Sequence, residues 1–156
     1  MAIELVRIDD RLIHGQVATT WTRNFDIEQI LIVNDEAKND PVQHAVANFA
    51  VPEGVKVMIF GVKQFAEVMK KSAIKKRTML LFTNPLDIKF LVDEGLSISE
   101  VNAGGMRFRE GRRRLEKAVS VTDEEHQAFL DLIEKGIHIN VQMVPKDPRV
   151  DYKTLV

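Results

Sequence analysis

Short apolar runs alternate along this chain with longer segments in which apolar residues recur at helical spacing. The apolar runs lie at 3–8, 27–34, 55–60, 77–83, 98–102, 118–121 and 137–144. The stretch from Ile30 to Val33 is apolar without a break, which is typical of strands that are buried on both faces of a parallel sheet. The pattern therefore predicts about seven strands.

Helix signals fall between these runs. The predicted helices cover about 15–24, 40–50, 63–71, 85–94 and 122–135. Asp40 is a good N-cap before a proline, and Thr122 with Glu125 forms a capping box. Gly95 and Gly136 are typical helix ends. Strands that alternate with helices predict a single α/β domain over 1–156, with a mostly parallel seven-stranded sheet and helices on both faces. The polar segment from 145 onward is expected to pack as a tail.

Composition removes several classes of function. The 156 residues suit one domain, and 22 basic against 23 acidic residues give a net charge of −1, so no wholesale binding to nucleic acid is expected. The chain has no cysteine, which excludes disulfides, thiolate catalysis and cysteine metal sites. No run approaches the roughly 18 apolar residues of a membrane span, and the N-terminus does not resemble a secretory signal. We expect no direct membrane insertion, no metal and no cofactor.

The loop after the first predicted strand carries the strongest candidate for chemistry. It reads Asp9-Asp10-Arg11-Leu12-Ile13-His14-Gly15-Gln16. His14 comes just before a predicted helix, where the N–H groups of Gly15 and Gln16 and the helix dipole favour an anion. Arg11 offers a forked set of donors to phosphate oxygens. A histidine nucleophile in such a setting suits phosphoryl transfer, with Asp9 or Asp10 accepting the other imidazole N–H.

Two further segments follow the fifth predicted strand. The first, at 102–106, contains the pair Gly104-Gly105, which allows positive φ and close approach of the backbone to a ligand, or forms a plain tight turn. The second, RFREGRRRLEK at 107–117, is the strongest local positive patch that we identify. It either docks an acidic partner or is a solvated loop balanced by its own glutamates.

Residue chemistry alone leaves three alternatives open. His14 is then a structural histidine at the edge of the core, or the general base of a small-molecule hydrolase or isomerase, or an incidental residue of a binding module that docks through 107–114. His44, His126 and His138 share no metal-like spacing and are interpreted as structural.

Several segments, in order, resemble one protein family. RIDDRLIHGQV at 7–17 resembles the signature of the IIB subunits of mannose/fructose/sorbose sugar phosphotransferase systems. NDE at 34–36, LLFTNPLD at 80–87, VNAGGMRF at 101–108 and KAVSVT at 117–122 are similar to later segments of those subunits. The family fold is a single α/β domain with a seven-stranded, mostly parallel sheet.

The resemblance implies a phosphocarrier. His14 would accept phosphate at Nδ1 from a histidine of a IIA subunit and pass it to a sugar carried by the membrane subunits IIC and IID. Arg11 would stabilise the phosphate. Asp10 and the 102–106 segment would line the same pocket, with Asn102, Gly104 and Gly105 binding phosphate. The chain would then act in the cytoplasm, at the inner face of the membrane through its partners. The sequence itself leaves open the sugar, the oligomeric state, the imidazole nitrogen that is phosphorylated and the role of 107–114.

Overall fold

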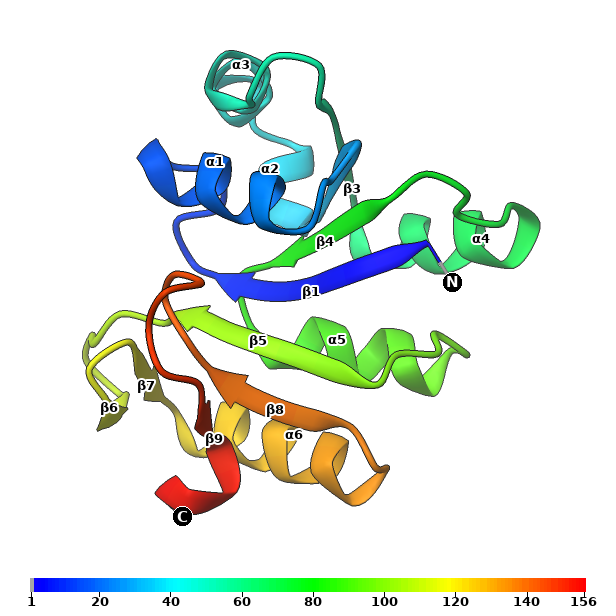
Figure 1. Cartoon of the computed structure of the whole chain (residues 1–156). Coiled ribbons are helices and arrows are strands. Elements are labelled where there is room, and N and C mark those ends of the chain that lie inside the picture. The colour runs from blue at the N-terminus through cyan, green and yellow to red at the C-terminus, as the bar shows by residue number, and fades with distance from the viewer. Residues whose placement is uncertain (1) are drawn as a thin grey trace.

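Seven strands form one twisted sheet through the middle of the molecule, in a computed structural model that describes residues 2–156 (Figure 1). The strands of this sheet are β1 (Ile3–Asp9), β2 (Gln29–Val33), β3 (Lys56–Phe60), β4 (Thr78–Phe82), β5 (Glu100–Gly105), β8 (His138–Val141) and β9 (Val150–Asp151). The helices are α1 (Gly15–Asn24), α2 (Asp35–Lys38), α3 (Pro41–Ala50), α4 (Val62–Lys71), α5 (Pro85–Asp93), α6 (Asp123–Glu134) and the 3₁₀ helix η1 (Tyr152–Leu155). The alternation predicted from the sequence is confirmed.

The strand order is β3-β2-β4-β1-β5-β8-β9, and every neighbouring pair is parallel except β8 with β9. β1 is therefore the central strand, with β4 on one side and β5 on the other. Helices α1 and α3 cover one face of the sheet, while α4, α5 and α6 cover the other (Figure 1). No helix in residues 2–156 is long and apolar enough to cross a membrane.

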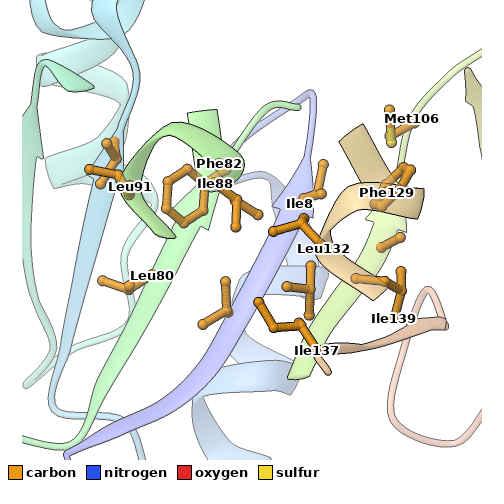
Figure 2. Packing of buried hydrophobic residues seen from close by; sticks show 14 of the residues in the cluster. Ile8, Leu80, Phe82, Ile88, Leu91, Met106, Phe129, Leu132, Ile137 and Ile139 are labelled. Carbon is orange, nitrogen blue, oxygen red and sulfur yellow. The ribbon is translucent and has the colours of Figure 1, made fainter. Parts of the chain in front are cut away.

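Each face of the sheet has its own apolar core. Val6 and Ile8 of β1 point into the larger cluster, which α4, α5 and α6 complete with side chains such as Phe129 (Figure 2). Leu5 points the other way, into a cluster that includes Trp21 of α1. Each fully buried side chain of this size contributes about 1.5–3 kcal/mol. Because side chains alternate along a strand, Arg7 and Asp9 lie on the same face as Leu5.

The membership of the sheet differs from the prediction in one strand. The run predicted at 118–121 forms β7 (Val119–Val121), which pairs with β6 (Arg113–Glu116) in a separate two-stranded antiparallel sheet. The seventh place in the main sheet is taken by β9, from the segment predicted to be a polar tail. Two residues, Val150 and Asp151, pair with the edge of β8 and satisfy its free backbone groups.

Most helix boundaries follow from the caps that the sequence showed. The Asp40 carboxylate accepts a hydrogen bond from the N–H of Val42, and Thr122 and Glu125 form a reciprocal capping box. The short helix α2 is not among the helices predicted from the sequence. It forms because Asn34 caps a single turn by accepting from the N–H of Ala37.

Candidate functional site

The loop between β1 and α1 is a sharp turn at the carboxyl end of the central strand. The N–H of Leu12 donates to the carbonyl of Asp9 at 2.9 Å, and Leu12 itself adopts φ of 57°. A left-handed leucine costs roughly 1–3 kcal/mol and persists only where surrounding contacts hold it. Leu12 packs against the α1-side core, and the next residue, Ile13, is buried in it. The strained turn carries His14 to the start of α1.

The His14 imidazole is fixed from one side by Asp9. Its Nε2 lies 2.8 Å from Oδ2 of Asp9, whose other oxygen, Oδ1, accepts from the backbone N–H of Arg11 at 3.0 Å. The Asp9 side chain is only 3% exposed and that of His14 is 19% exposed. A carboxylate is an acceptor only, so the neutral imidazole carries its proton on Nε2 and leaves a lone pair on Nδ1. Of the two carboxylates named from the sequence, Asp9 is the one that binds this ring.

Behind Asp9 lies Arg7, which was not singled out in the sequence. Its guanidinium donates from Nη2 to Oδ2 of Asp9 at 3.1 Å, and from Nη1 to Oδ1 of Asn102 at 2.6 Å. Nη1 also donates to the carbonyl of Gln142 at 3.3 Å. Burial lowers the pKa of Arg7, and the Asp9 carboxylate opposes that change. An arginine within the predicted strand IELVRI at 3–8 was the available signal, because a charged side chain inside a central strand needs buried partners.

The N-terminus of α1 offers unoccupied donors beside His14. His14 is the N-cap residue but its side chain makes no capping hydrogen bond, and the first turn contains no acidic residue. Gly15 adopts φ of 48°, in the left-handed region, and both Gly15 and Gln16 are exposed. The Arg11 side chain is also exposed, and within residues 2–156 it forms no ion pair. These groups form an open site where an anion would meet helix N–H donors and a guanidinium.

The Asp10 carboxylate binds two arginines, whereas the imidazole of His14 is bound by Asp9. Asp10 accepts hydrogen bonds from the backbone N–H and Nε of Arg107, at 2.9 and 3.1 Å, and from Nη1 of Arg112 at 3.3 Å. Arg112 also makes a bidentate pair with Glu125, at 3.0 and 2.9 Å, and its side chain is 1% exposed. Asp10 thus fastens the basic segment to the end of β1. Arg112 is therefore a buried structural arginine, and it belongs neither to a docking surface nor to a solvated loop.

The segment 102–106 does lie beside the His14 loop, as the resemblance implied. The N–H of Asp10 donates to the carbonyl of Gly105 at 2.8 Å. However, Gly104 and Gly105 belong to β5, and neither is among the residues with positive φ, so the predicted glycine turn is wrong. A Cβ on Gly104 would overlap the guanidinium of Arg7, and one on Gly105 would lie 2.9 Å from Oδ1 of Asp9. The missing side chains at Gly104 and Gly105 therefore make room for Arg7 and Asp9 of this protein and not for a ligand.

Asn102 is likewise held inside the protein. Its Nδ2 donates to Oδ1 of Asn140 at 3.1 Å and to the carbonyl of Gln142 at 3.0 Å, while its oxygen binds Arg7. The residue is buried. These contacts assign Asn102 to the support of Arg7, behind the loop, and leave it no free atom toward a phosphate on His14.

A polar cavity of about 490 Å³ opens next to the loop, at the carboxyl ends of β1, β2 and β4. Its lining residues are Asp10, Leu12, Asn34, Asp35, Glu36, Ala37, Asp40, Gln43, Thr83, Asn84, Leu86, Asp87, Arg109 and Glu125. Burial raises the pKa of Asp87, the hydrogen bond from Asn84 opposes the change, and the charge of Asp35 adds to it. Carboxylates outnumber cations on this wall, so the cavity is unfavourable for an anion.

The three other histidines make structural contacts. Nε2 of His44 lies 2.9 Å from the carbonyl of Lys38, and Nδ1 of His126 lies 2.7 Å from the hydroxyl of Tyr152. His138 bridges two carboxylates at the far edge of the sheet, those of Glu100 and Asp151. Their interpretation as structural residues agrees with these positions.

Comparison with known proteins gives the family. The family model described as the PTS system sorbose subfamily IIB component matches residues 3–156. The mannose-specific EIIAB component of the Escherichia coli (strain K12) PTS is 41% identical over 157 residues, which cover all of this chain and 49% of that relative. The chain thus spans about half the length of the EIIAB relatives it matches. The sorbose-specific EIIB component of Klebsiella pneumoniae is 39% identical, with 97% of this chain and 93% of that protein covered.

Solved structures agree with the sequence relatives. The crystal structure of the IIBSor domain of the sorbose permease from Klebsiella pneumoniae superposes with a TM-score of 0.93 at 38% identity, and covers 99% of this chain and 96% of that one. The manxB structure from Thermoanaerobacter tengcongensis gives a TM-score of 0.91 at 35% identity, with 99% and 94% covered. By sequence and by fold, the chain belongs to the sorbose subfamily of IIB components of the sugar phosphotransferase system.

Proposed function

We propose that His14 is a phosphocarrier residue that accepts a phosphoryl group from a phosphohistidine of a IIA subunit and passes it to a sugar. The observation that carries the proposal is the hydrogen bond between Nε2 of His14 and the buried carboxylate of Asp9. It holds the proton on Nε2, so Nδ1 keeps the lone pair that a nucleophile needs. Family membership supports the reaction class, because IIB components are phosphotransferases.

The transfer takes place in two balanced steps. In the first, the Nδ1 lone pair attacks phosphorus, the new N–P bond forms, and the N–P bond to the IIA histidine breaks. In the second, a sugar hydroxyl attacks phosphorus, the bond to Nδ1 breaks and returns its electron pair to the imidazole, and the hydroxyl proton passes to water. Both steps are dominated by positioning and by stabilisation of charge on the phosphoryl oxygens. Arg11 and the N–H groups of Gly15 and Gln16 are the donors that we assign to those oxygens.

The open position of the site suits two successive partners. His14 lies at the tip of a loop on the carboxyl edge of the sheet, so a IIA surface and then the membrane subunits IIC and IID could each reach it in turn. A relative whose name joins A and B parts in one EIIAB component supports the choice of IIA as donor. We place the chain in the cytoplasm, at the inner face of the membrane. The relatives named for mannose, sorbose and fructose suggest a sugar of that kind.

Incubation with a phosphoryl-donor cascade that ends in phosphorylated IIA tests the proposal. We expect one acid-labile, base-stable phosphate per chain, lost in His14→Ala and retained in the matched control His44→Gln. The Asp9–His14 pair would also serve a general base, and that alternative predicts no stable uptake of phosphate. Undiminished labelling of His14→Ala would overturn the assignment. Transfer onward to sugar requires vesicles that contain IIC and IID, and is scored separately.

A further inference from the structure

We propose that the exposed apolar side of helix α3 and the carboxylates beside it dock a basic amphipathic segment on the cytoplasmic side of the membrane subunits IIC and IID. We call this surface the α3 face, and it consists of Val42, Val46 and Phe49 with the acidic residues Asp35, Glu36 and Asp40. The inference rests on the proposed function, in which the membrane subunits are the second partner. It names the part of this chain to which that partner binds.

Helix α3 is mostly exposed, and yet residues 41–50 include no charged side chain. Of these ten residues, Ala47 is the one that is buried. In Figure 1, α3 is the outermost helix on its side of the sheet. A helix at the surface of a monomer ordinarily presents charged and polar side chains to water. The core of this chain therefore does not explain why the sequence of α3 is so apolar.

The outward side of α3 carries a stripe of apolar side chains. Val42, Val46 and Phe49 follow the spacing i, i+4, i+7, which places them on one side of the helix. They are 65%, 44% and 94% exposed. An exposed aromatic side chain next to further apolar ones is typical of the anchors by which proteins bind a partner. The stripe therefore marks α3 as an interaction surface.

Carboxylates without a cationic partner lie next to the stripe. Asp40, the N-cap of α3, lines the polar cavity together with Asp35 and Glu36. Within residues 2–156 none of these three forms an ion pair, whereas Asp10 and Glu125 on the same wall are paired with Arg112.

The cavity has a shortage of positive charge. Arg109 is the single cation among its lining residues. The charge of Asp35 adds to the effect of burial in raising the pKa of Asp87, so these two carboxylates repel each other. A cationic side chain from a partner would relieve that repulsion.

Charge decides between the possible occupants of the α3 face. A two-fold dimer would bring the same patch of two copies together, carboxylate against carboxylate. The cytoplasmic leaflet of a membrane is anionic, and so is the phosphohistidine that a IIA subunit presents. Cytoplasmic loops of membrane proteins instead carry an excess of lysine and arginine. A basic amphipathic segment would place its apolar side on Phe49 and its cations among the carboxylates.

The α3 face is continuous with the loop that carries His14. Asp10 and Leu12 of that loop line the same cavity as Asp40 and Gln43. A segment docked on α3 would hold the membrane subunits beside the loop and leave the α1 end of the loop free for the phosphoryl group. Docking of this kind raises the effective concentration of the sugar acceptor at His14.

Co-sedimentation with inverted vesicles that contain the IIC and IID subunits of the same system measures the docking. Phe49→Ser removes the anchor at a position where the side chain supports no core. A second variant neutralises the acidic part and keeps its shape, including an N-cap for α3, with the substitutions Asp35→Asn, Glu36→Gln and Asp40→Asn.

Matched controls lie on α4, α5 and α6, across the sheet from α3. Phe90→Ser removes another exposed phenylalanine. A triple variant removes three exposed negative charges, as the acidic variant does, with the substitutions Glu67→Gln, Glu124→Gln and Glu134→Gln.

We expect Phe49→Ser to weaken binding to the vesicles about tenfold or more, the order found for an aromatic anchor of an interface. The acidic variant should bind more weakly at low salt and show a flatter salt dependence. Both controls should bind as the wild type does, and IIA should phosphorylate His14 at the same rate in every variant.

Equal binding of Phe49→Ser and the wild type would overturn the proposal, and so would a wild type that does not bind these vesicles. Three other losses in Phe49→Ser would each identify a different occupant and overturn it as well. They are slower phosphorylation by IIA, weaker binding to protein-free vesicles of anionic lipid, and loss of a dimer in sedimentation velocity. If wild-type His14 accepts no phosphate, the proposed function fails, whereas binding to the vesicles still decides the role of the α3 face.

Discussion

Asp9→Asn is the sharpest perturbation of the candidate site, because it changes one atom and keeps the shape. In the wild type, Oδ2 accepts from both Arg7 and His14, while Oδ1 accepts from the N–H of Arg11. An asparagine has one oxygen and one NH₂ group in these two places. If the NH₂ group replaces Oδ2, it faces the donor of Arg7 and forces His14 to accept at Nε2. If it replaces Oδ1, it faces the backbone N–H of Arg11.

Either orientation removes at least one charge-assisted hydrogen bond in a buried setting. Such a bond contributes about 1.5–3 kcal/mol. At about 1.4 kcal/mol for each factor of ten, the rate of phosphoryl transfer to His14 should fall by one to two powers of ten. Solvent screening does not reduce this figure much, because the Asp9 side chain is 3% exposed. The fold should also lose about 3–5 kcal/mol, since Arg7 loses the carboxylate that compensates its buried charge.

Rapid-quench measurement of phosphate transfer from phosphorylated IIA gives the rate, and urea unfolding of the same samples gives the stability. The assay is run under conditions in which wild type and variant are both more than nine-tenths folded, so that a loss of stability is not mistaken for a loss of transfer rate. Asp26→Asn is the control, because Asp26 is an exposed carboxylate paired with the exposed Arg77. A folded Asp9→Asn that transfers phosphate within about twofold of the wild-type rate would refute the role of Asp9, since the smallest expected loss is about tenfold.

Three further predictions concern other parts of the chain. Arg11→Lys keeps the charge but loses the forked donor geometry, so it should slow transfer to His14 by one to two powers of ten without changing stability, and an unchanged rate would remove Arg11 from the site. Replacing the exposed Arg113 and Arg114 with glutamine should slow phosphorylation by IIA at low salt and flatten its salt dependence, because peripheral charges act on association; equal rates at every salt concentration would exclude a docking role. Burial, and then the charge of Arg113, lower the pKa of His126, so folding excludes a proton that the unfolded chain binds. The free energy of unfolding should therefore fall as the pH drops below the ordinary value of 6.5, and His126→Gln, which keeps an acceptor for Tyr152, should lose part of that dependence in urea titrations.

The sequence by itself determined the class of fold and the position of the candidate histidine, His14. Unbroken apolar runs between capped helices require a sheet buried on both faces, and the caps at Asp40 and Thr122 form as the local sequence indicates. The place of His14 between a strand and a helix also followed from local signals. These features depend on residues close together in the chain, and hydrogen bonds of a few residues' span decide them.

Only the tertiary structure decided which side chains support the histidine. Asp9 and Asp10 are neighbours in sequence, yet Asp9, the last residue of β1, binds Arg7 and His14, whereas Asp10 binds Arg107 and Arg112. No local pattern separates the two, because the choice depends on how β1 pairs with β5.

The same holds for the glycines and for the last strand of the sheet. Gly104 was predicted to lie in a turn, but it is a residue of β5. It has no side chain, which leaves room for the guanidinium of Arg7, a residue 97 positions earlier in the chain. Val150 and Asp151 joined the sheet although their segment is polar, because the edge of β8 offered free backbone groups. Local sequence encodes propensity and periodicity, whereas partners that lie far apart in the chain are fixed only when strand order and register bring them together.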